Sequence, residues 1–266
     1  MMSLDSIPIW CVTLLIVGGL GISVEVGYRV GAARQRRYPD EKEQVVGTVV
    51  GATLGLLAFL LAFTFGLAAS RFEEKRTVVL KEANVIGTTY LRAELLPFGT
   101  ATIQQELRDY VDDRLEVIET RDATKLLAHA EQSHRQLWRQ AIDVSRQAPD
   151  SLMVSLFVQS LNEVIDVHAE RVLLGLRSRL PLVLWGSLGS LAVLALAGIG
   201  YQEGLTKSRR SLAVLMLMVG FSSIAALIID LDRPQDGFLR VSQQPLIDLK
   251  NSMIQNAANE TDVPSL

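Results

Sequence analysis

Ionisable side chains at the ends of apolar segments are the residues of this sequence with the clearest potential for chemistry. Glu25 follows one charge-free apolar run, and Asp230 and Asp232 end another. Ionisable groups at membrane depth are costly and commonly belong to ion or proton pathways. Arg71 and Arg76 follow a third apolar run, and a salt bridge from one of them to an aspartate is the structural alternative. These five residues are the candidate ion or salt-bridge sites.

A second candidate site lies within the apolar run 45–70. Gly47, Gly51 and Gly55 are spaced four residues apart, which lets helix backbones approach closely. The same spacing continues to Phe59 and Phe63, and because four residues rotate a helix by only about 40°, these two rings share a face. Two interpretations stay open. Either the glycines pack against a neighbouring helix while the phenylalanines face lipid, or the rings form a hydrophobic constriction that gates a pore by dewetting.

No pattern typical of catalysis or of a bound cofactor is present. The glycine-rich stretch 47–55 lacks the lysine of a phosphate-binding loop, and no G-x-S-x-G occurs. A single cysteine, Cys11, excludes an internal disulfide and a cysteine-based zinc site. His129, His134 and His168 are too scattered for a metal set, and a surface role is expected for them. The net charge of −3 gives no attraction for nucleic acid. We therefore expect no enzyme activity, no metal, no cofactor and no nucleic-acid partner.

The elements that must position the candidate residues are four membrane spans. A bilayer core about 30 Å thick needs roughly 20 apolar residues of helix. The segments 7–24, which can extend past Glu25 to Val30, 45–70, 180–202 and 211–229 meet this requirement. Of the 26 basic and 29 acidic residues, 15 and 17 lie between positions 71 and 179. This distribution predicts an all-α protein of the lipid bilayer. Its parts are spans one and two (1–70), a helical extramembrane domain (71–179), spans three and four (180–230) and a C-terminal tail (231–266).

Helical spacing of apolar residues extends through the polar insert. Nothing interrupts the chain between the second span and the break Leu96-Pro97-Phe98-Gly99, which predicts one continuous helix. Its apolar face comprises Val78, Val79, Ala83 and Ile86, with Glu82 placed elsewhere. Further helices are predicted over 102–119, from Thr120 or Asp122 to Gln147, and from Asp150 or Ser151 without a break to Pro181. The core candidates of the last of these are Leu156, Leu161, Ile165 and Leu173.

Positive charges do not decide the orientation of the spans. Four spans place both termini and the insert on one side, with the loops 25–44 and 203–210 on the other. Lys and Arg residues near the span ends number eight on each side. An excess of such charges marks the cytoplasmic side, and by density the short loops are slightly the more basic.

Three stretches of the sequence carry a family resemblance. They are ASRFEEKR at 69–76 with EANVIGT at 82–88, YLRAELLP at 90–97, and the segment 231–246, which contains LDRP, GF and VSQQPL. With the four-span layout over nearly the whole chain, the sequence is identified as a member of the bestrophin-like membrane proteins of bacteria.

A more distant likeness to the bestrophin anion channels implies a function. Those channels are homopentamers with a helical insert between spans two and three, and the second span lines a central pore for small anions. Their pores narrow at three bulky apolar residues spaced i, i+4, i+8. Matching on Ser70-Arg71-Phe72 places Gly55, Phe59 and Phe63 at these positions. Because glycine is small, the constriction here is expected to be shorter or wider.

The likeness also bears on location and regulation. It implies a multi-pass protein of the cell (inner) membrane with its insert and both termini in the cytoplasm. Animal bestrophins bind calcium through an acidic run after the fourth span. The corresponding residues here, Asp230, Asp232 and Asp236, match that run poorly, which argues against calcium regulation.

Three functions compete at this point. The leading hypothesis is an oligomeric anion channel. The second is a membrane-anchored sensor or scaffold whose helical domain binds a partner, favoured because the second span offers no polar ring beyond Thr48, Thr53 and Thr64. The third is an ion-coupled transporter that uses Glu25 and Asp230, although the interrupted spans common in transporters are not predicted.

Overall fold

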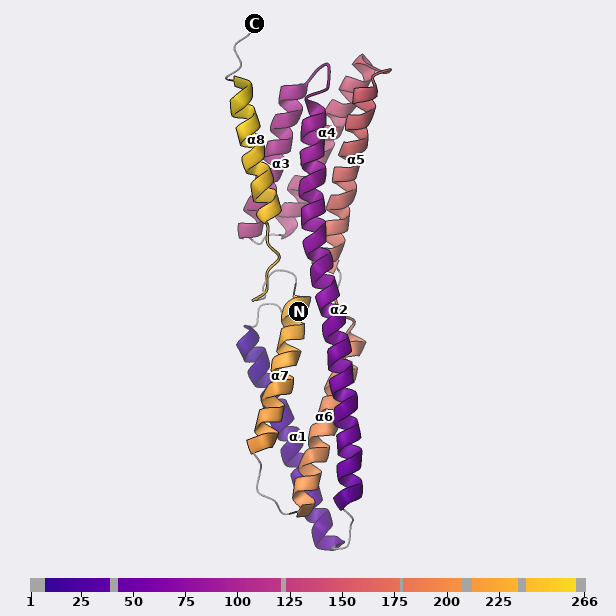
Figure 1. The fold of residues 1–266 in the computed structure, drawn as a ribbon, viewed down its shortest axis with the longest axis vertical. Helices are drawn as coiled ribbons and strands as arrows, with labels where there is room; N and C mark the ends of the chain where they lie inside the picture. Colours follow the sequence, from indigo (N-terminus) through magenta and orange to yellow (C-terminus); the bar gives the residue numbers. More distant parts are fainter. Residues whose placement is uncertain are drawn as a thin grey trace. The chain divides into compact units, whose positions relative to one another are not determined.

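Helices make up all the regular structure of this computed structural model (Figure 1). It describes residues 8–38, 43–120, 123–177, 179–206, 212–233 and 238–261, and no strand occurs in these ranges. In chain order the elements are α1 (Ile9–Arg37), α2 (Glu43–Ala93), α3 (Thr100–Thr120), α4 (Ala123–Gln147), α5 (Leu152–Val172), the π-helical turn η2 (Leu173–Arg177), α6 (Leu182–Thr206), α7 (Leu212–Asp232) and α8 (Gln244–Thr261). The predicted all-α class is confirmed for the described residues.

The chain divides into two compact units. The membrane unit comprises Met1–Phe72 and Arg179–Arg240, and the polar unit comprises Glu73–Ser178 and Val241–Leu266. Each has its own apolar core. The helix α2 contributes its residues up to Phe72 to the first unit and the remainder to the second.

Four helices are long and apolar enough to cross a membrane, as predicted. They are α1, the segment Val45–Ala93 of α2, α6 and α7. Leu57 and Leu61 of α2, Leu196 of α6 and Ile228 of α7 are buried together in the core of the membrane unit. The protein is therefore a multi-pass membrane protein.

Close backbone contact joins α1 to α6, which lie side by side (Figure 1). A Cβ atom added at Gly27 would overlap the carbonyl of Ala197, and one added at Gly200 would overlap the carbonyl of Val24. Gly31 and Gly204 repeat the arrangement one turn further on. This pair of small-xxx-small motifs lets the two backbones touch.

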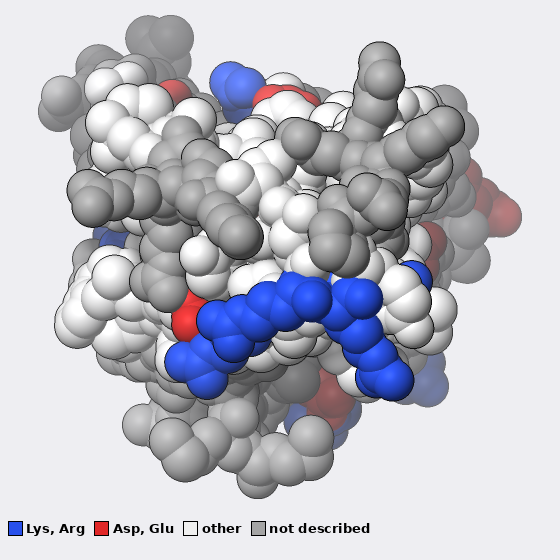
Figure 2. Space-filling model, turned by 90° about the horizontal axis from the view of Figure 1, so that it is seen from below, with Lys and Arg blue, Asp and Glu red and all other residues white. Residues whose placement is uncertain are grey.

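Basic side chains gather at the end of the membrane unit where α1 finishes. Figure 2 shows them as a band across this end. The last turn of α1 supplies Arg34, Arg36 and Arg37. Cations are favourable at a helix C-terminus, where they face the negative end of the helix dipole.

The polar unit is a bundle of amphipathic helices, and its predicted boundaries are largely confirmed. α2 runs without interruption and ends before Pro97, and Gly99 adopts the left-handed φ of 75° that a side chain would disfavour. Ser151 caps α5 by accepting a hydrogen bond from the N–H of Val154. For α4 the sequence offered two possible N-terminal caps, Thr120 and Asp122. Asp122 lies outside the described residues.

Core predictions for the polar unit are right for α2 but wrong for most of α5. Val78, Val79, Ala83 and Ile86 are all buried. In α5, however, the buried apolar residues are Val154, Phe157, Leu161, Val164 and Val167, whereas Leu173 is 55% exposed. Only Leu161 was correctly chosen, because apolar residues occupy so much of this helix that the buried face is ambiguous from sequence.

Two features of the chain's later part differ from expectation. The fourth insert helix does not continue unbroken to Pro181, because its α-helical hydrogen bonding ends at Val172 and gives way to η2. The segment 231–266, expected as a tail, contains α8. Its Leu246 and Met253 are 0% and 2% exposed within the core of the polar unit.

Candidate functional site

In the membrane unit, α2 has one buried face and one exposed face. Leu57 and Leu61 are 1% and 6% exposed, whereas Phe59 and Phe63 are 65% and 55% exposed. Gly55 is exposed as well, and an added Cβ atom there would meet nothing within 4 Å. The three predicted pore residues therefore share a face that no other described part of the chain covers.

The two glycines predicted to pack helices have different surroundings. A Cβ atom added at Gly47 would lie 2.9 Å from the side-chain nitrogen of Gln202, so α2 approaches α6 closely there. At Gly51 an added Cβ atom would meet nothing within 4 Å. Within one chain, Gly47 lies at a helix contact, and Gly51 lies on the exposed face with Gly55.

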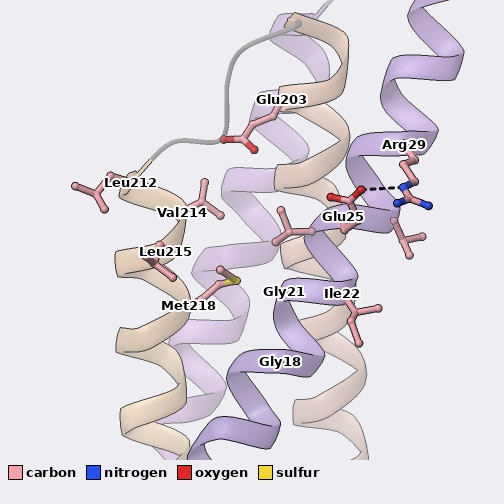
Figure 3. Close-up of a pocket in the computed structure, with 12 residues that line it drawn as sticks. Gly18, Gly21, Ile22, Glu25, Arg29, Glu203, Leu212, Val214, Leu215 and Met218 are labelled. Carbon is pink, nitrogen blue, oxygen red and sulfur yellow. Dashed lines mark hydrogen bonds and ion pairs between the residues drawn. The ribbon is translucent and has the colours of Figure 1, made fainter.

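Glu25 belongs to an ion pair within α1. Its carboxylate lies 2.8 Å from Nε of Arg29, one turn further along the helix (Figure 3). The Glu25 side chain is 30% exposed and that of Arg29 is 77% exposed. A carboxylate placed in a membrane helix is thereby kept next to a positive charge.

Asp230 and Asp232 both accept hydrogen bonds from backbone amides. Asp230 is 4% exposed, and its two oxygens accept from the N–H groups of Phe238 and Leu239 at 2.8 and 2.9 Å. Asp232 accepts from the N–H group of Leu180 at 2.9 Å. Such charge-assisted bonds hold the chain that follows α7 and the chain that leads into α6. The contacts of Asp230 and Asp232 are those of residues that stabilise the local backbone.

The two candidate arginines have unlike environments. Arg71 is half-buried, and its Nη1 is buried without a hydrogen-bond partner among the described residues. Arg76 is 69% exposed and lies 3.7 Å from Glu73, one turn earlier in α2. For these two residues a role in attracting ions remains a prediction.

A buried ion network in the polar unit was not predicted. The carboxylate of Glu82, in α2, is 0% exposed and lies between two guanidinium groups. Arg114 of α3 approaches it to 2.8 Å and is itself 2% exposed. Arg171 of α5 donates to its other oxygen and also donates, at 2.8 Å, to Gln243 just before α8. The carboxylate joins α2 to α3 and α5, and Arg171 connects this group to the segment that precedes α8.

Two histidines and a tyrosine extend this network. Tyr110 is buried, and its hydroxyl lies 3.4 Å from Nδ1 of His168. The ring of His134 packs against both, with its centroid 5.2 Å from that of Tyr110 and 4.9 Å from that of His168. Burial, reinforced by the charge of Arg114, lowers the pKa of His134 to about 4 and that of His168 to about 3. Both rings are therefore neutral at pH 7. No group of three metal-ligating side chains is found in the described ranges.

Comparison with known proteins identifies the family. A family model described as the bestrophin-like domain matches residues 18–246. The chain belongs to the bestrophin-like family. The match confirms the resemblance drawn from the motifs between Ala69 and Pro97 and from the segment after α7. No curated protein and no solved structure matches this bestrophin-like chain.

The histidine pair predicts that the polar unit of this bestrophin-like protein loses stability in acid. An unfolded histidine has a pKa near 6.5, so between about pH 6.5 and pH 4 the unfolded chain binds protons that the folded chain excludes. Stability therefore falls as the pH falls through this window, by about 2 kcal/mol for each histidine at pH 5. Unfolding between pH 7.5 and 4.5 measures the effect, followed by the fluorescence of Trp138 in α4 in a protein whose other tryptophans, Trp10 and Trp185, are replaced by phenylalanine.

Histidine variants provide the controls for this experiment. The double variant His134→Gln/His168→Gln should show a shallower pH dependence, whereas His129→Gln, at an exposed position of the same helix α4, should keep the wild-type slope. If stability depended on pH equally in the wild type and in both variants, the low pKa values of His134 and His168 would be contradicted.

The sequence contained a signal for the buried network. Glu82 lies four residues after Val78 and four before Ile86, which places it on the apolar face itself. Arg114 follows Tyr110 by four residues in the same way, and His168 follows Val164. The expectations that Glu82 lies off the apolar face and that His134 and His168 are surface residues are wrong. A charged or polar residue spaced three or four positions from the buried apolar residues of its helix indicates such a network.

Proposed function

We propose that this bestrophin-like protein is an oligomeric channel for small anions, a homopentamer whose pore is lined by the exposed face of α2. The proposal is supported by the residues that this face of α2 exposes. Gly51, Gly55, Phe59 and Phe63 are all exposed in the single chain. A helix face made of glycines with two large rings suits close approach of other helices and a local narrowing.

The two rings provide the constriction of the proposed pore. An apolar ring of side chains gates by excluding water from the narrowest section. Phe59 and Phe63 are separated by one helical turn, about 6 Å along the axis. Gly55 precedes them and leaves the pore wide at that level, so the constriction is shorter than one formed by three bulky side chains.

Removal of the rings is expected to raise conductance. Phe59→Ala and Phe63→Ala widen the constriction and weaken dewetting, so single-channel or liposome flux should rise by more than about twofold. Purified protein reconstituted in planar bilayers under a KCl gradient gives both the conductance and, from the reversal potential, the sign of the permeant ion.

Phe65 offers a matched control on the same helix. It is 39% exposed but lies about 160° around α2 from Phe63. Phe65→Ala should leave conductance unchanged. An equal rise from Phe65→Ala, a cation-selective reversal potential, or no current from any of the proteins would contradict the proposal. Native mass spectrometry of the same preparations gives the oligomeric state, and a monomer would favour the sensor or scaffold function instead.

The proposed location is the cell inner membrane, with the polar unit and both termini in the cytoplasm. The likeness to bestrophins supports this orientation. The arginines in the last turn of α1 would then lie on the opposite side, where Figure 2 shows the basic band.

A further inference from the structure

The guanidinium group of Arg114 lies inside the polar unit with much of its hydrogen-bonding capacity unused. The side chain is 2% exposed, and its Nη2 atom lies 2.8 Å from the carboxylate of Glu82. Its Nε and Nη1 atoms are buried and have no hydrogen-bond partner among the described residues. Buried N–H groups are almost always paired with protein atoms, water or an ion. A species other than the chain itself is therefore expected beside this guanidinium.

The groups next to Arg114 add a further donor. Its positive charge adds to the effect of burial in lowering the pKa of both His134 and His168, so it lies near both rings. The Nε2 atom of His134 is buried and, in the described part of the chain, has no partner either. A neutral imidazole carries its proton on one of its two nitrogens, so Nε2 can donate. Oε1 of Glu82 also lacks a well-aligned hydrogen bond, but one oxygen cannot satisfy three nitrogen atoms of a guanidinium.

The charges of this buried group do not balance. Arg114 and Arg171 each carry one positive charge, and Glu82 supplies one negative charge, which leaves an excess of one positive charge. The second contact of Arg171 is to Gln243, whose amide is neutral. An unbalanced charge inside a protein is costly, and a counter-ion taken from solution would offset it. A water molecule can accept hydrogen bonds from Arg114, but it would leave the charge unbalanced.

We propose that one small monovalent anion, of the class of chloride, binds beside Arg114 in the core of the polar unit. It accepts hydrogen bonds from Nε and Nη1 of Arg114 and from Nε2 of His134. Glu82 remains the chain's own counter-charge for both arginines. The size of the anion follows from burial, because a phosphate or an organic acid would have to separate α3 from its neighbours. The site is distinct from the exposed face of α2, and the inference does not depend on ion conduction.

Thermal unfolding at constant ionic strength tests the proposal. The full-length protein with Trp138 as its only tryptophan is unfolded at pH 7.5 in mixtures of sodium chloride and sodium gluconate, whose anion is too large for a buried site. An ion that binds only the folded protein stabilises it increasingly as its concentration rises. The midpoint should rise by at least about 4 °C as chloride increases from about 10 to about 300 mM. A midpoint independent of chloride would mean that water occupies the site, and would overturn the proposal.

Two arginine variants separate this site from a general effect of salt. Arg114→Met leaves Glu82 balanced by Arg171 alone, so it should abolish the dependence on chloride. Arg108→Met is the matched control on the same helix, because all three nitrogen atoms of Arg108 already donate to a tyrosine or a glutamine. This control should keep the dependence on chloride. Equal dependence in Arg114→Met and the wild type would assign the effect to another site and overturn the proposal.

Bromide gives a direct measurement, which remains decisive if Arg114→Met does not fold. Bromide has the charge and chemistry of chloride, and it is located in crystals of the wild-type protein by its anomalous X-ray scattering. An anomalous peak beside Nε or Nη1 of Arg114 is expected in crystals grown in sodium bromide. Electron density at that position without an anomalous signal would identify water and overturn the proposal, as would the absence of any density.

Discussion

Replacing Glu82 with glutamine is expected to lower the stability of the polar unit by roughly 3–5 kcal/mol. The carboxylate is 0% exposed and is the shared counter-charge of Arg114 and Arg171. Glutamine preserves the size of the side chain but leaves two buried guanidinium groups without a negative partner. Removing one member of a buried ion group is far more costly than removing an exposed one, because the remaining charge stays desolvated.

The measurement uses a fluorescence reporter confined to the polar unit. The chain has three tryptophans, of which Trp138 lies in α4, while Trp10 and Trp185 lie in the membrane unit. In a background with the latter two replaced by phenylalanine, thermal unfolding reports α4 and its neighbours. Glu82→Gln should lower the midpoint by more than about 10 °C.

A neighbouring exposed pair provides the matched control. Lys81 and Glu170 form an ion pair at 2.8 Å with side chains 47% and 45% exposed. Glu170→Gln should lower the unfolding midpoint far less than Glu82→Gln does, since water screens exposed pairs. Similar losses of stability in Glu82→Gln and Glu170→Gln would show that the buried network stabilises the polar unit no more than an exposed ion pair does.

An apolar replacement of the whole network gives a further check. The triple variant Glu82→Leu/Arg114→Met/Arg171→Met removes all three charges together. Buried ion groups replaced by apolar residues of similar volume are often no less stable than the original. The triple variant should therefore be more stable than Glu82→Gln alone.

Substitution of Gly200 by valine is expected to have a comparably large effect on the membrane unit. Even a single added carbon would overlap the carbonyl of Val24, and the carbonyl is part of the α1 backbone, which has no rotamer to change. The helices must separate, with loss of packing along the whole α1–α6 contact. We expect at least about 3 kcal/mol of destabilisation, the upper range for an overpacked core, and a marked loss of monodisperse protein in detergent.

Gly189 supplies a control within the same helix. An added Cβ atom there would meet nothing within 4 Å, and the residue is exposed. Gly189→Val should leave the elution profile and unfolding temperature near those of the wild type. If Gly200→Val behaved identically to Gly189→Val, the close contact of α1 with α6 would be disproved.

The spans could be predicted because membrane insertion depends on a local property. A run of about 20 apolar residues is recognisable without knowledge of its neighbours, and all four runs became helices. The end of α2 was equally local, since Pro97 and Gly99 interrupt a helix by their own chemistry. The α1–α6 contact required a comparison of two distant segments, although the glycine spacing was visible in both.

Features that depend on tertiary packing were harder to predict. The η2 turn contains no proline, so the sequence from Ser151 to Pro181 resembles one helix. The face of α5 that is buried depends on which neighbours cover it, and its many apolar residues allow several choices. For the candidate pore, the periodicity placed Phe59 and Phe63 on one face, and the likeness to the bestrophins added Gly55. What covers that face is a property of the assembly rather than of one chain.

The paired charges of α2 and α5 have a consequence for how these two helices can slide past one another. Lys81 and Glu82 contact Glu170 and Arg171, a dipeptide of the opposite charge order. A slip of α5 by one turn in either direction would present Val167 or Gly175 to Glu82 in place of Arg171. Apolar side chains alone would tolerate such a slip, because they recur every turn. The charge pairs therefore set the register of the bundle, and they do so with partners separated by 89 residues.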